Sequence, residues 1–363
     1  MKKKILIIEN FVHYRNAIES LKLFKKDFSV NLIIPYKDRH RIEKKFYKNC
    51  FFFKGPTSLI YFYVLIKSLK YDFILISTLP EYPPHLKTIK NLLFFIIYYS
   101  FYFILSAILN HKLILQIRNI EAFDKRKKTS LNYVRNLFLK FTDKYICETK
   151  FIAERFKYKI LNNKKAKVTY QYINHYEKHH YNGHNKKKQK VYIGILGAID
   201  DKKKNYTIIR NSFSKLLKKN KHIDVTLIFL GKILNPNSHK VLKEFNNLNI
   251  KYFNKYISEK DFQKWGSKCL FLISSINNSR KYGIAKPTGS FGDAIYLKKQ
   301  LLINHSTDPL KEFKSFSTYF KNENEFYKNI KKILNNKISF RFKFEKYLDR
   351  KKNIKRIRKI LEI

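Results

Sequence analysis

Short runs of apolar residues alternate with longer, helix-like segments along most of this chain of 363 residues. The runs lie at 5–8, 30–34, 50–53, 73–77, 113–117 and 144–147, and then at 191–196, 225–230, 250–253, 269–274 and 301–303. Strands that are apolar on both sides need helices on both faces of their sheet, which is typical of parallel sheets. The alternation therefore predicts an α/β protein with doubly wound sheets.

A polar stretch at 174–190 interrupts this alternation near the middle of the chain. It holds four of the 11 histidines, which are His175, His179, His180 and His184. A His-rich tract can bind metal, but no acidic or Cys partners accompany these histidines in a fixed pattern. We interpret the stretch as a linker between two Rossmann-like domains, 1–173 and 191–340. A basic helix at 341–363 is expected to pack back on the first domain.

The charge of the chain is strongly positive, with 77 Lys and Arg against 27 Asp and Glu and a formal net charge of +50. Such an excess suggests nucleic acid or an anionic membrane as a partner. The composition is also typical of an AT-rich genome, and the aromatic residues lie largely within apolar runs rather than between basic residues. We therefore expect no nucleic-acid partner, although a basic RNA-binding protein remains an alternative.

The cysteines and the N-terminus indicate the compartment. Cys50, Cys147 and Cys269 are isolated in the sequence, which predicts three buried thiols rather than disulfides or a zinc site. This pattern fits a reducing cytoplasm. The first ten residues become polar too soon for a signal peptide and predict a first strand instead.

The most apolar segment, 91–110, carries no charged residue and is long enough to span a bilayer. It lies between two predicted strands, however, and a spanning helix there would split the sheet. We interpret 91–110 and a second apolar segment, 59–69, as helices of the first domain that lie on an anionic membrane. An ordinary buried helix and a true span are the alternatives. The expected location is cytoplasmic and peripheral, on the inner face of the cell membrane.

The stretch 271–304 predicts a strand, a cationic loop, a short helix and a second strand. Thr288 or Ser290 can cap the helix, with Gly289 between them. The start of a helix attracts anions through its unpaired N–H groups and its dipole. Lys281 and Lys286 lie just upstream, and Asp293 lies one turn inside. This combination suits a phosphorylated sugar, and the alternative is an ordinary crossover in a basic protein.

A second strand–loop–helix unit begins at residue 191. Its strand ends at Gly197, its loop contains Lys203 and Lys204, and its helix is predicted to start at about Asn205. A further helix is predicted after Ser258, which can cap it. The lysines of the two units can converge on one diphosphate.

These motifs resemble those of the GT-B glycosyltransferases, specifically the family-4-like retaining enzymes that build bacterial surface polysaccharides. The resemblance covers most of the second half and implies two Rossmann-like domains that face each other across a cleft. It also implies that Gly197 and Lys203 or Lys204 meet the diphosphate of a nucleotide-diphosphate sugar. Gly289 and Ser290 would offer backbone amides, and Asp293 would bind the ribose. The acceptor, a glycan or lipid-linked molecule, would bind the first domain.

The chain departs from this family at one acid. The family often has two glutamates eight positions apart, whereas this chain lacks the first and has Asp293 at the second. In the first half the resemblance is weaker and suggests Arg118, Asn119 and His13 as catalytic candidates, with Glu9 and Glu121 nearby.

The chemistry implied by the resemblance needs no cofactor beyond the nucleotide sugar. Lysines and helix amides can stabilise a departing diphosphate without a metal, and the loops contain no D-x-D motif. An inverting GT-B transferase, a sugar-nucleotide epimerase and a non-catalytic protein on the same scaffold remain alternatives.

Overall fold

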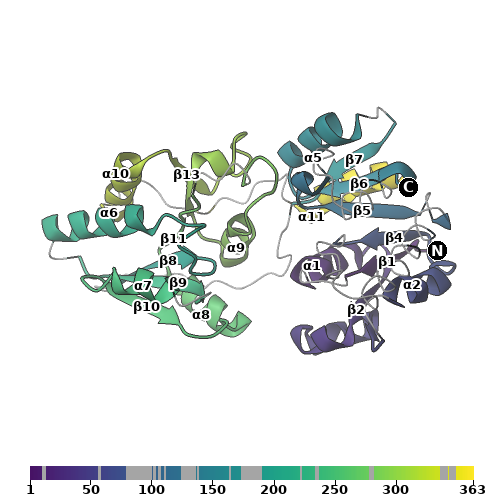
Figure 1. The fold of residues 1–363 in the computed structure, drawn as a ribbon, viewed down its shortest axis with the longest axis horizontal. Helices are drawn as coiled ribbons and strands as arrows, with labels where there is room; N and C mark the ends of the chain where they lie inside the picture. Colours follow the sequence, from purple (N-terminus) through teal and green to yellow (C-terminus); the bar gives the residue numbers. More distant parts are fainter. Residues whose placement is uncertain are drawn as a thin grey trace, which may run out of the picture. The chain divides into compact units, whose positions relative to one another are not determined.

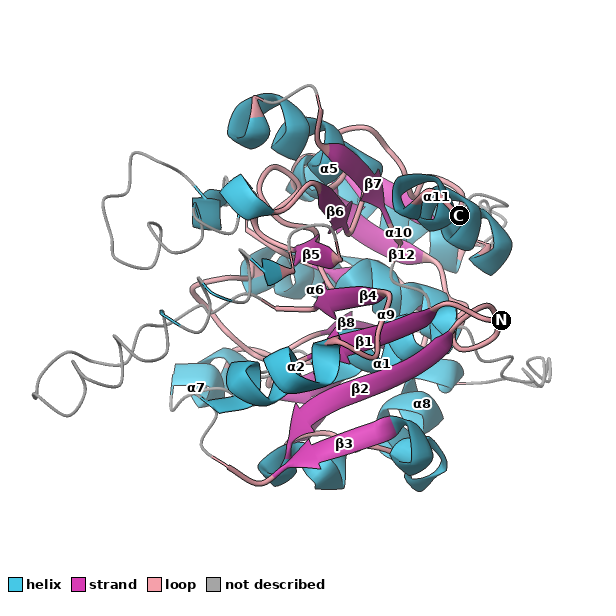
Figure 2. Cartoon of the chain, turned by 90° about the vertical axis from the view of Figure 1, so that its right-hand side faces the viewer, coloured by secondary structure: helices cyan, strands magenta, loops and turns pink. Residues whose placement is uncertain are grey.

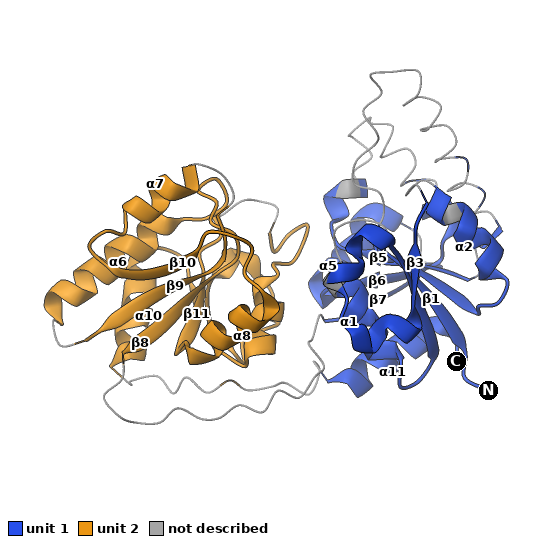
Figure 3. Cartoon of the chain, turned by 90° about the horizontal axis from the view of Figure 1, so that it is seen from below, with its two compact units in different colours: residues 1–176, 347–363 blue, residues 177–346 orange. Residues whose placement is uncertain are grey.

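The chain forms two compact units, one of Met1–Tyr176 with Tyr347–Ile363 and one of Glu177–Lys346 (Figure 3). The computed structural model describes residues 1–9, 14–55, 59–78, 100, 104, 108–109, 112–123, 136, 139–162, 165–172, 190–220, 223–233, 237–277, 282–335, 342 and 349–363. The predicted linker, 174–190, lies outside these residues except for Lys190. We call the two parts unit 1 and unit 2 and treat each by itself, and the cleft between domains stays a prediction.

Unit 1 contains a parallel sheet of seven strands in the order β3-β2-β1-β4-β5-β6-β7, which lie side by side in Figure 2. The strands are β1 (Lys4–Ile8), β2 (Ser29–Pro35), β3 (Cys50–Phe53), β4 (Phe73–Ile76), β5 (Leu113–Ile117), β6 (Lys144–Cys147) and β7 (Lys167–Tyr170). β1, β4, β5 and β6 are buried almost throughout. These strands therefore need cover on both faces of the sheet.

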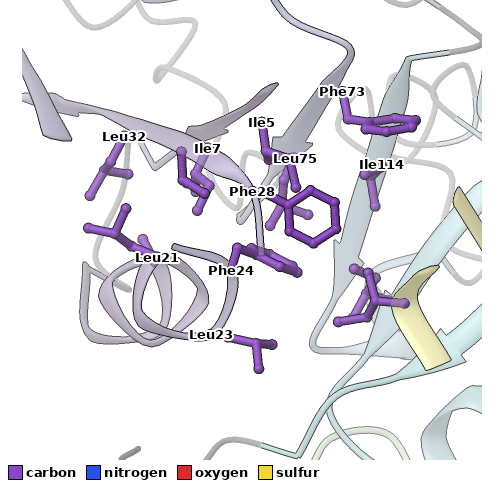
Figure 4. Close-up of a cluster of buried hydrophobic side chains, with 14 of the residues drawn as sticks. Ile5, Ile7, Leu21, Leu23, Phe24, Phe28, Leu32, Phe73, Leu75 and Ile114 are labelled. Carbon is purple, nitrogen blue, oxygen red and sulfur yellow. The ribbon is translucent and has the colours of Figure 1, made fainter. Parts of the chain in front are cut away.

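The helices of unit 1 come from the segments between strands and from the end of the chain. They are α1 (Tyr14–Phe24), α2 (Ile60–Ser68), α5 (Lys150–Phe156) and α11 (Arg350–Leu361), with shorter turns η1 (Tyr36–Arg41), η2 (Lys44–Asn49), η4 (Ile120–Phe123) and η5 (Lys157–Leu161). The apolar face of α1 packs on the sheet, where Leu21 and Phe24 meet side chains such as Ile5, Leu32 and Leu75 (Figure 4). Ile354, Ile357 and Ile360 of α11 belong to the same cluster.

Unit 2 contains a parallel sheet of six strands in the order β10-β9-β8-β11-β12-β13. Figure 1 labels β10, β9, β8, β11 and β13 of this sheet. The strands are β8 (Val191–Leu196), β9 (Val225–Lys232), β10 (Asn249–Phe253), β11 (Phe271–Ser274), β12 (Leu301–Asn304) and β13 (Ser317–Phe320). The helices are α6 (Tyr206–Lys219), α7 (Asn237–Lys243), α8 (Glu259–Lys268), α9 (Ser290–Leu297) and α10 (Glu323–Leu334), with a short turn η6 (His305–Thr307). The predicted α/β class with two parallel, doubly wound sheets is confirmed.

Two helix starts agree with the sequence. Asn205 caps α6 by accepting a hydrogen bond from the Ile208 amide at 3.2 Å. Ser258 caps α8 in the same way, accepting from the Asp261 amide at 3.0 Å. Both predictions are confirmed because a side-chain oxygen three residues before a free amide is a local feature that needs no tertiary context.

Each sheet contains a point at which the order of the strands reverses. In unit 1 the chain runs outward from β1 toward β3, and then from β4 toward β7. In unit 2 it runs from β8 toward β10, and then from β11 toward β13. Loops that leave neighbouring strands in opposite directions open a space at the carboxyl ends of those strands, and open α/β sheets bind their ligands there. We call these places the switch points, β1/β4 in unit 1 and β8/β11 in unit 2.

The apolar segment 59–69 contains α2, and several of its large apolar side chains are partly exposed. Phe62 and Ile66 are 45% and 56% exposed, and Leu59 and Leu69 at the ends of the helix are 39% and 79% exposed. Among the helices that lie within the described residues, none combines the length and apolar character needed to cross a bilayer. The segment 91–110 lies almost entirely outside the described residues.

Candidate functional site

The turn that follows β8 requires two glycines. Gly197 has φ +82°, a backbone conformation that side chains with a Cβ disfavour. A Cβ on Gly231 of β9 would lie 2.2 Å from the Gly197 carbonyl oxygen. The two glycines therefore allow the backbones of the β8 turn and β9 to approach closely beside the carboxyl end of β8.

Lys204 extends its side chain back to the end of β8. Its ammonium donates a hydrogen bond to the Leu196 carbonyl. A Cβ on Gly197 would lie 2.9 Å from the Lys204 Nζ, so the glycine keeps the space beside the ammonium free of a side chain. Withdrawal from solvent lowers the pKa of Lys204 to about 7, while the carboxylates of Asp293 and Asp200 act in the opposite direction. The switch point thus holds a lysine whose pKa would rise if a negatively charged group bound beside it. The lysine would then take up a proton near neutral pH.

Lys203 occupies a different environment. Its side chain is 62% exposed, and its Nζ lies 3.1 Å from the Asp200 carboxylate. The sequence left Lys203 and Lys204 as equal candidates for the diphosphate. Of the two, the structure places Lys204 at the end of β8 and Lys203 at the surface.

The helix α9 begins at the other side of the switch point. Its cap is Gly289, whose position is exposed and where an added Cβ would meet no atom within 4 Å. Ser290 donates to the Ser274 hydroxyl at the end of β11, at 2.8 Å, and its amide donates to the Thr288 hydroxyl at 3.3 Å. This arrangement fastens the helix to the strand, and open space remains beside Gly289.

The prediction that Thr288 or Ser290 caps α9 is wrong. Gly289 occupies the cap position and provides no side-chain hydrogen bond. Thr288 lies one residue before the cap, and Ser290 lies one residue after it and is turned toward Ser274. The Ser290 hydroxyl is engaged by Ser274 of the neighbouring strand, and the Thr288 hydroxyl accepts from the Ser290 amide from one position before the cap.

The remaining donor-side candidates lie in three places. Asp293 is in the first turn of α9, near enough to raise the pKa of Lys204. Lys286 stacks its ammonium over the Tyr282 ring, 4.6 Å from the ring centroid. Lys281 lies outside the described residues.

A second polar cluster lies at the unit 1 switch point. Glu9 follows β1 and is fully buried, and it accepts a hydrogen bond at 2.8 Å from the hydroxyl of Thr78, which follows β4. Arg118 follows β5 and donates to the Ser77 hydroxyl at 2.8 Å. A buried carboxylate and a guanidinium thus meet where three neighbouring strands end.

Arg118 lies between two carboxylates. Its Nη2 is 3.9 Å from Glu9, and its Nε is 3.8 Å from Glu148, which follows β6. Both distances exceed a hydrogen bond, and the buried Nε and Nη1 have no hydrogen-bond partner in the described structure. Buried donors of this kind cost free energy unless a ligand or a rearranged side chain satisfies them.

The other two catalytic candidates are not part of this cluster as described. Asn119 accepts a hydrogen bond from the Glu121 amide at 3.1 Å and so shapes the turn at η4. His13 lies outside the described residues.

Sequence reasoning missed several members of these clusters, namely Ser77, Thr78, Glu148 and Ser274. Each directly follows or ends a predicted strand, and Glu148 also accepts a hydrogen bond from Asn16 at 3.1 Å. Aligning the carboxyl ends of all predicted strands would have found them, because those ends share one edge of a parallel sheet.

Comparison with known proteins identifies the fold. No protein-family model matches the sequence, and no curated protein matches it. Solved structures match nearly the whole chain. The UDP-GlcNAc 2-epimerase of Methanocaldococcus jannaschii is 13% identical, with 98% of this chain and 99% of that chain covered and a TM-score of 0.59. The lipopolysaccharide outer core galactosyltransferase WaaB is 8% identical, with 98% and 99% covered and a TM-score of 0.59.

A third similar structure is a trehalose-6-phosphate protein from E. coli bound with UDP-2-fluoro glucose. It is 10% identical, with 99% of this chain and 95% of that chain covered and a TM-score of 0.54. At such low identity these structures establish the architecture alone. The chain has the GT-B fold, with one seven-stranded and one six-stranded parallel sheet.

Proposed function

We propose that this protein is an enzyme of nucleotide-sugar chemistry, and specifically a glycosyltransferase that moves a hexose-like sugar from a nucleotide diphosphate to an acceptor. The observation that carries the proposal is the unit 2 switch point. Lys204 and Gly197 lie at the carboxyl end of β8, and Asp293 in the first turn of α9 is near enough to interact with the Lys204 ammonium. That combination suits a diphosphate, because cations and helix amides both stabilise phosphate charge.

In this proposal the protein lowers the barrier mainly by stabilising the leaving group. Negative charge grows on the diphosphate as the bond to the sugar breaks, and Lys204 and the first amides of α9 are fixed beside it. Asp293 in the first turn of α9 would accept hydrogen bonds from the ribose hydroxyls. The mechanism would be retaining and metal-independent, and the acceptor would be lipid-linked or a surface polysaccharide. Gly289, Ser290, Thr288, Lys286, Lys281 and Lys203 would complete the donor side.

In unit 1 we propose Arg118 as a catalytic residue. Arg118 is held by Ser77 and flanked by Glu9 and Glu148, and its Nε and Nη1 are the donors left to a substrate oxygen. Asn119 and His13 remain candidates for the same role.

A sugar-nucleotide epimerase is the second candidate. The observation that favours it is the pair of buried carboxylates, Glu9 and Glu148, on either side of Arg118. Epimerisation at a sugar carbon needs proton removal and return, which carboxylates in a buried site can perform. Of the similar structures above, one is a UDP-GlcNAc 2-epimerase and another is a galactosyltransferase.

We also propose that the protein works at the inner face of the cell membrane. The support is the partly exposed apolar side chains of α2 on a chain with a formal charge of +50. A helix with an apolar face can enter the boundary between headgroups and acyl chains, and lysines favour an anionic surface.

The test is a thermal-shift screen of UDP-, GDP-, CMP- and dTDP-sugars on the full chain, followed by product analysis with the best ligand. Lys204→Gln should abolish the shift, whereas Lys203→Gln should retain most of it. A transferase releases nucleoside diphosphate in proportion to acceptor, and an epimerase yields an altered sugar without acceptor. If none of the nucleotide sugars shifts the melting temperature, or if both lysine variants behave alike, the site assignment is wrong.

A further inference from the structure

A cavity of about 520 Å³ lies in unit 2 at the carboxyl ends of β11, β12 and β13. Ser275, Asn304 and Phe320 line it from these strands, and Asn205 and Ile208 line it from the start of α6. Its volume is within the range of ~300–1,000 Å³ found for small-molecule sites. The donor site proposed above uses none of these residues.

The cavity and the proposed donor site lie on different sides of the end of β11. Ser274 accepts a hydrogen bond from Ser290 of α9, whereas the next residue, Ser275, lines the cavity. Successive side chains of an extended segment point to opposite faces. The backbone of Ser275 is also fastened to the start of α6, because its carbonyl accepts from the Asn205 amide at 2.7 Å. A ligand in the cavity would therefore meet α6 rather than α9.

Two asparagines that line the cavity have their side-chain oxygens already engaged. The Asn205 side-chain oxygen accepts from the Ile208 amide at 3.2 Å, and the Asn304 side-chain oxygen accepts from the Ser306 amide at 3.0 Å. The NH₂ groups of these two asparagines are therefore the groups that can donate to a ligand. The Ser275 hydroxyl is buried and has no hydrogen-bond partner in the described structure. It can reorient by rotation about a single side-chain bond.

The charges and the apolar wall of the cavity indicate which class of ligand it suits. Lys321 supplies an exposed ammonium, and the start of α6 adds the positive end of a helix dipole. No carboxylate is among the described lining residues, although Glu325 accepts from the Lys321 backbone amide nearby at 2.8 Å. Ile276 and Phe320 give an apolar wall, which suits the C–H face of a sugar ring.

We propose that this cavity is a second ligand site, which binds a monosaccharide phosphate in addition to whatever occupies the unit 2 switch point. The phosphate would lie toward Lys321 and the start of α6, and the ring would lie against Ile276 and Phe320. The proposal does not depend on the transferase activity, because it concerns residues outside that site.

The test is calorimetric titration of the full chain with glucose 1-phosphate, with inorganic phosphate and glucose as separate arms. Saturable binding of glucose 1-phosphate, stronger than that of either fragment, is the expected result. Lys321→Glu should weaken it about tenfold or more, since a charge-assisted contact is lost and repulsion is added. Lys332→Glu, at an exposed position of α10, is the matched control and should bind as the unmodified chain does.

Two further variants keep the result interpretable. Ile208→Trp adds bulk to the cavity wall from a half-buried position and should also reduce binding. Lys204→Gln alters the switch point and should leave binding unchanged. Absence of saturable binding would overturn the proposal, as would binding that survives both Ile208→Trp and Lys321→Glu. Loss of binding in Lys204→Gln would place the ligand at the switch point instead.

Discussion

Lys204 shows how one residue can combine a structural role with a proposed chemical one. Its ammonium satisfies the carbonyl at the end of β8, yet burial disfavours the charged form. The pKa of about 7 is well below that of a lysine in an unfolded chain, so the unfolded state binds more protons between about pH 7 and 10.5. Lys204 therefore makes the free energy of unfolding rise with pH across that window.

Nucleotide binding should be coupled to proton uptake at this lysine. At about pH 8 Lys204 is mainly neutral in the free protein, and a diphosphate beside it would raise its pKa and draw in up to about one proton. Titration calorimetry in two buffers of different ionisation enthalpy measures this uptake directly. It should disappear at about pH 6, where the lysine is already protonated, and it should be absent in Lys204→Met. Equal heats in both buffers at the higher pH would exclude Lys204 from the contact.

Gly197→Ala should be harmful for two separate reasons. The positive φ costs about 1–2 kcal/mol for a residue with a Cβ, and the added methyl would crowd the Lys204 ammonium. We expect lower unfolding free energy in denaturant melts and weaker nucleotide binding. Gly289→Ala is the control for stability, because that position has open space and an ordinary φ of −61°. A Gly197→Ala protein as stable as Gly289→Ala would contradict this account.

At the scale of elements, the sequence of α2 is more apolar than its partly exposed position requires. Its residues are apolar on nearly all sides, but only part of the helix is covered: Ile60 and Val64 are buried, while Phe62 and Ile66 are exposed. A soluble surface helix would carry polar residues on that side. An exposed apolar face on an ordered helix indicates an interaction surface.

Replacing Phe62 and Ile66 by Ser should weaken binding to vesicles. Removing two large apolar side chains from the bilayer boundary should cost about 2–4 kcal/mol of membrane affinity, and thermal stability should change little because both positions are exposed. Sedimentation with vesicles that contain anionic lipid measures the loss. Ile60→Ser and Val64→Ser on the buried side should instead lower the melting temperature. Unchanged sedimentation of the Phe62 and Ile66 variant would remove α2 from the membrane proposal.

At the scale of the molecule, the last helix completes the first unit. Buried isoleucines of α11 share a cluster with β1, β2 and α1. Asp27 accepts from Arg350 and Arg358 of α11, and Arg356 stacks over the Tyr170 ring at 4.3 Å. The chain thus builds unit 1, then unit 2, and returns to unit 1 with a helix whose other side carries lysines.

Ile357→Ala should destabilise unit 1 and leave unit 2 unaffected. Ile357 is fully buried, and a large-to-small change in such a core costs about 2–5 kcal/mol. Scanning calorimetry, with each transition assigned by ligands or by proteolysis, should show that only the unit 1 transition moves to lower temperature. Lys355→Ala on the exposed side of α11 is the matched control. An equal shift of both transitions would mean that the units do not unfold separately.

The sequence by itself determined the features that depend on neighbouring residues. Continuous apolar runs such as 113–117 predicted buried parallel strands. The sequence also predicted a helix start at about Asn205 and a helix cap at Ser258, and the structure confirms both. These follow from local burial and hydrogen bonding, which a short window of sequence encodes. The α/β class with doubly wound sheets followed from the same patterns.

Only the tertiary structure decided which polar residues lie close together. It brings Glu9, Thr78, Arg118 and Glu148 together from four strand ends, and it separates Lys204 at the end of β8 from Lys203 at the surface. It also turns Ser290 away from its own helix toward Ser274. These outcomes depend on strand order and on contacts between segments far apart in the chain. A single sequence shows where the strands lie along the chain, but it does not show which strands are neighbours in the sheet. The strand order determines which loops lie next to one another at the carboxyl edge.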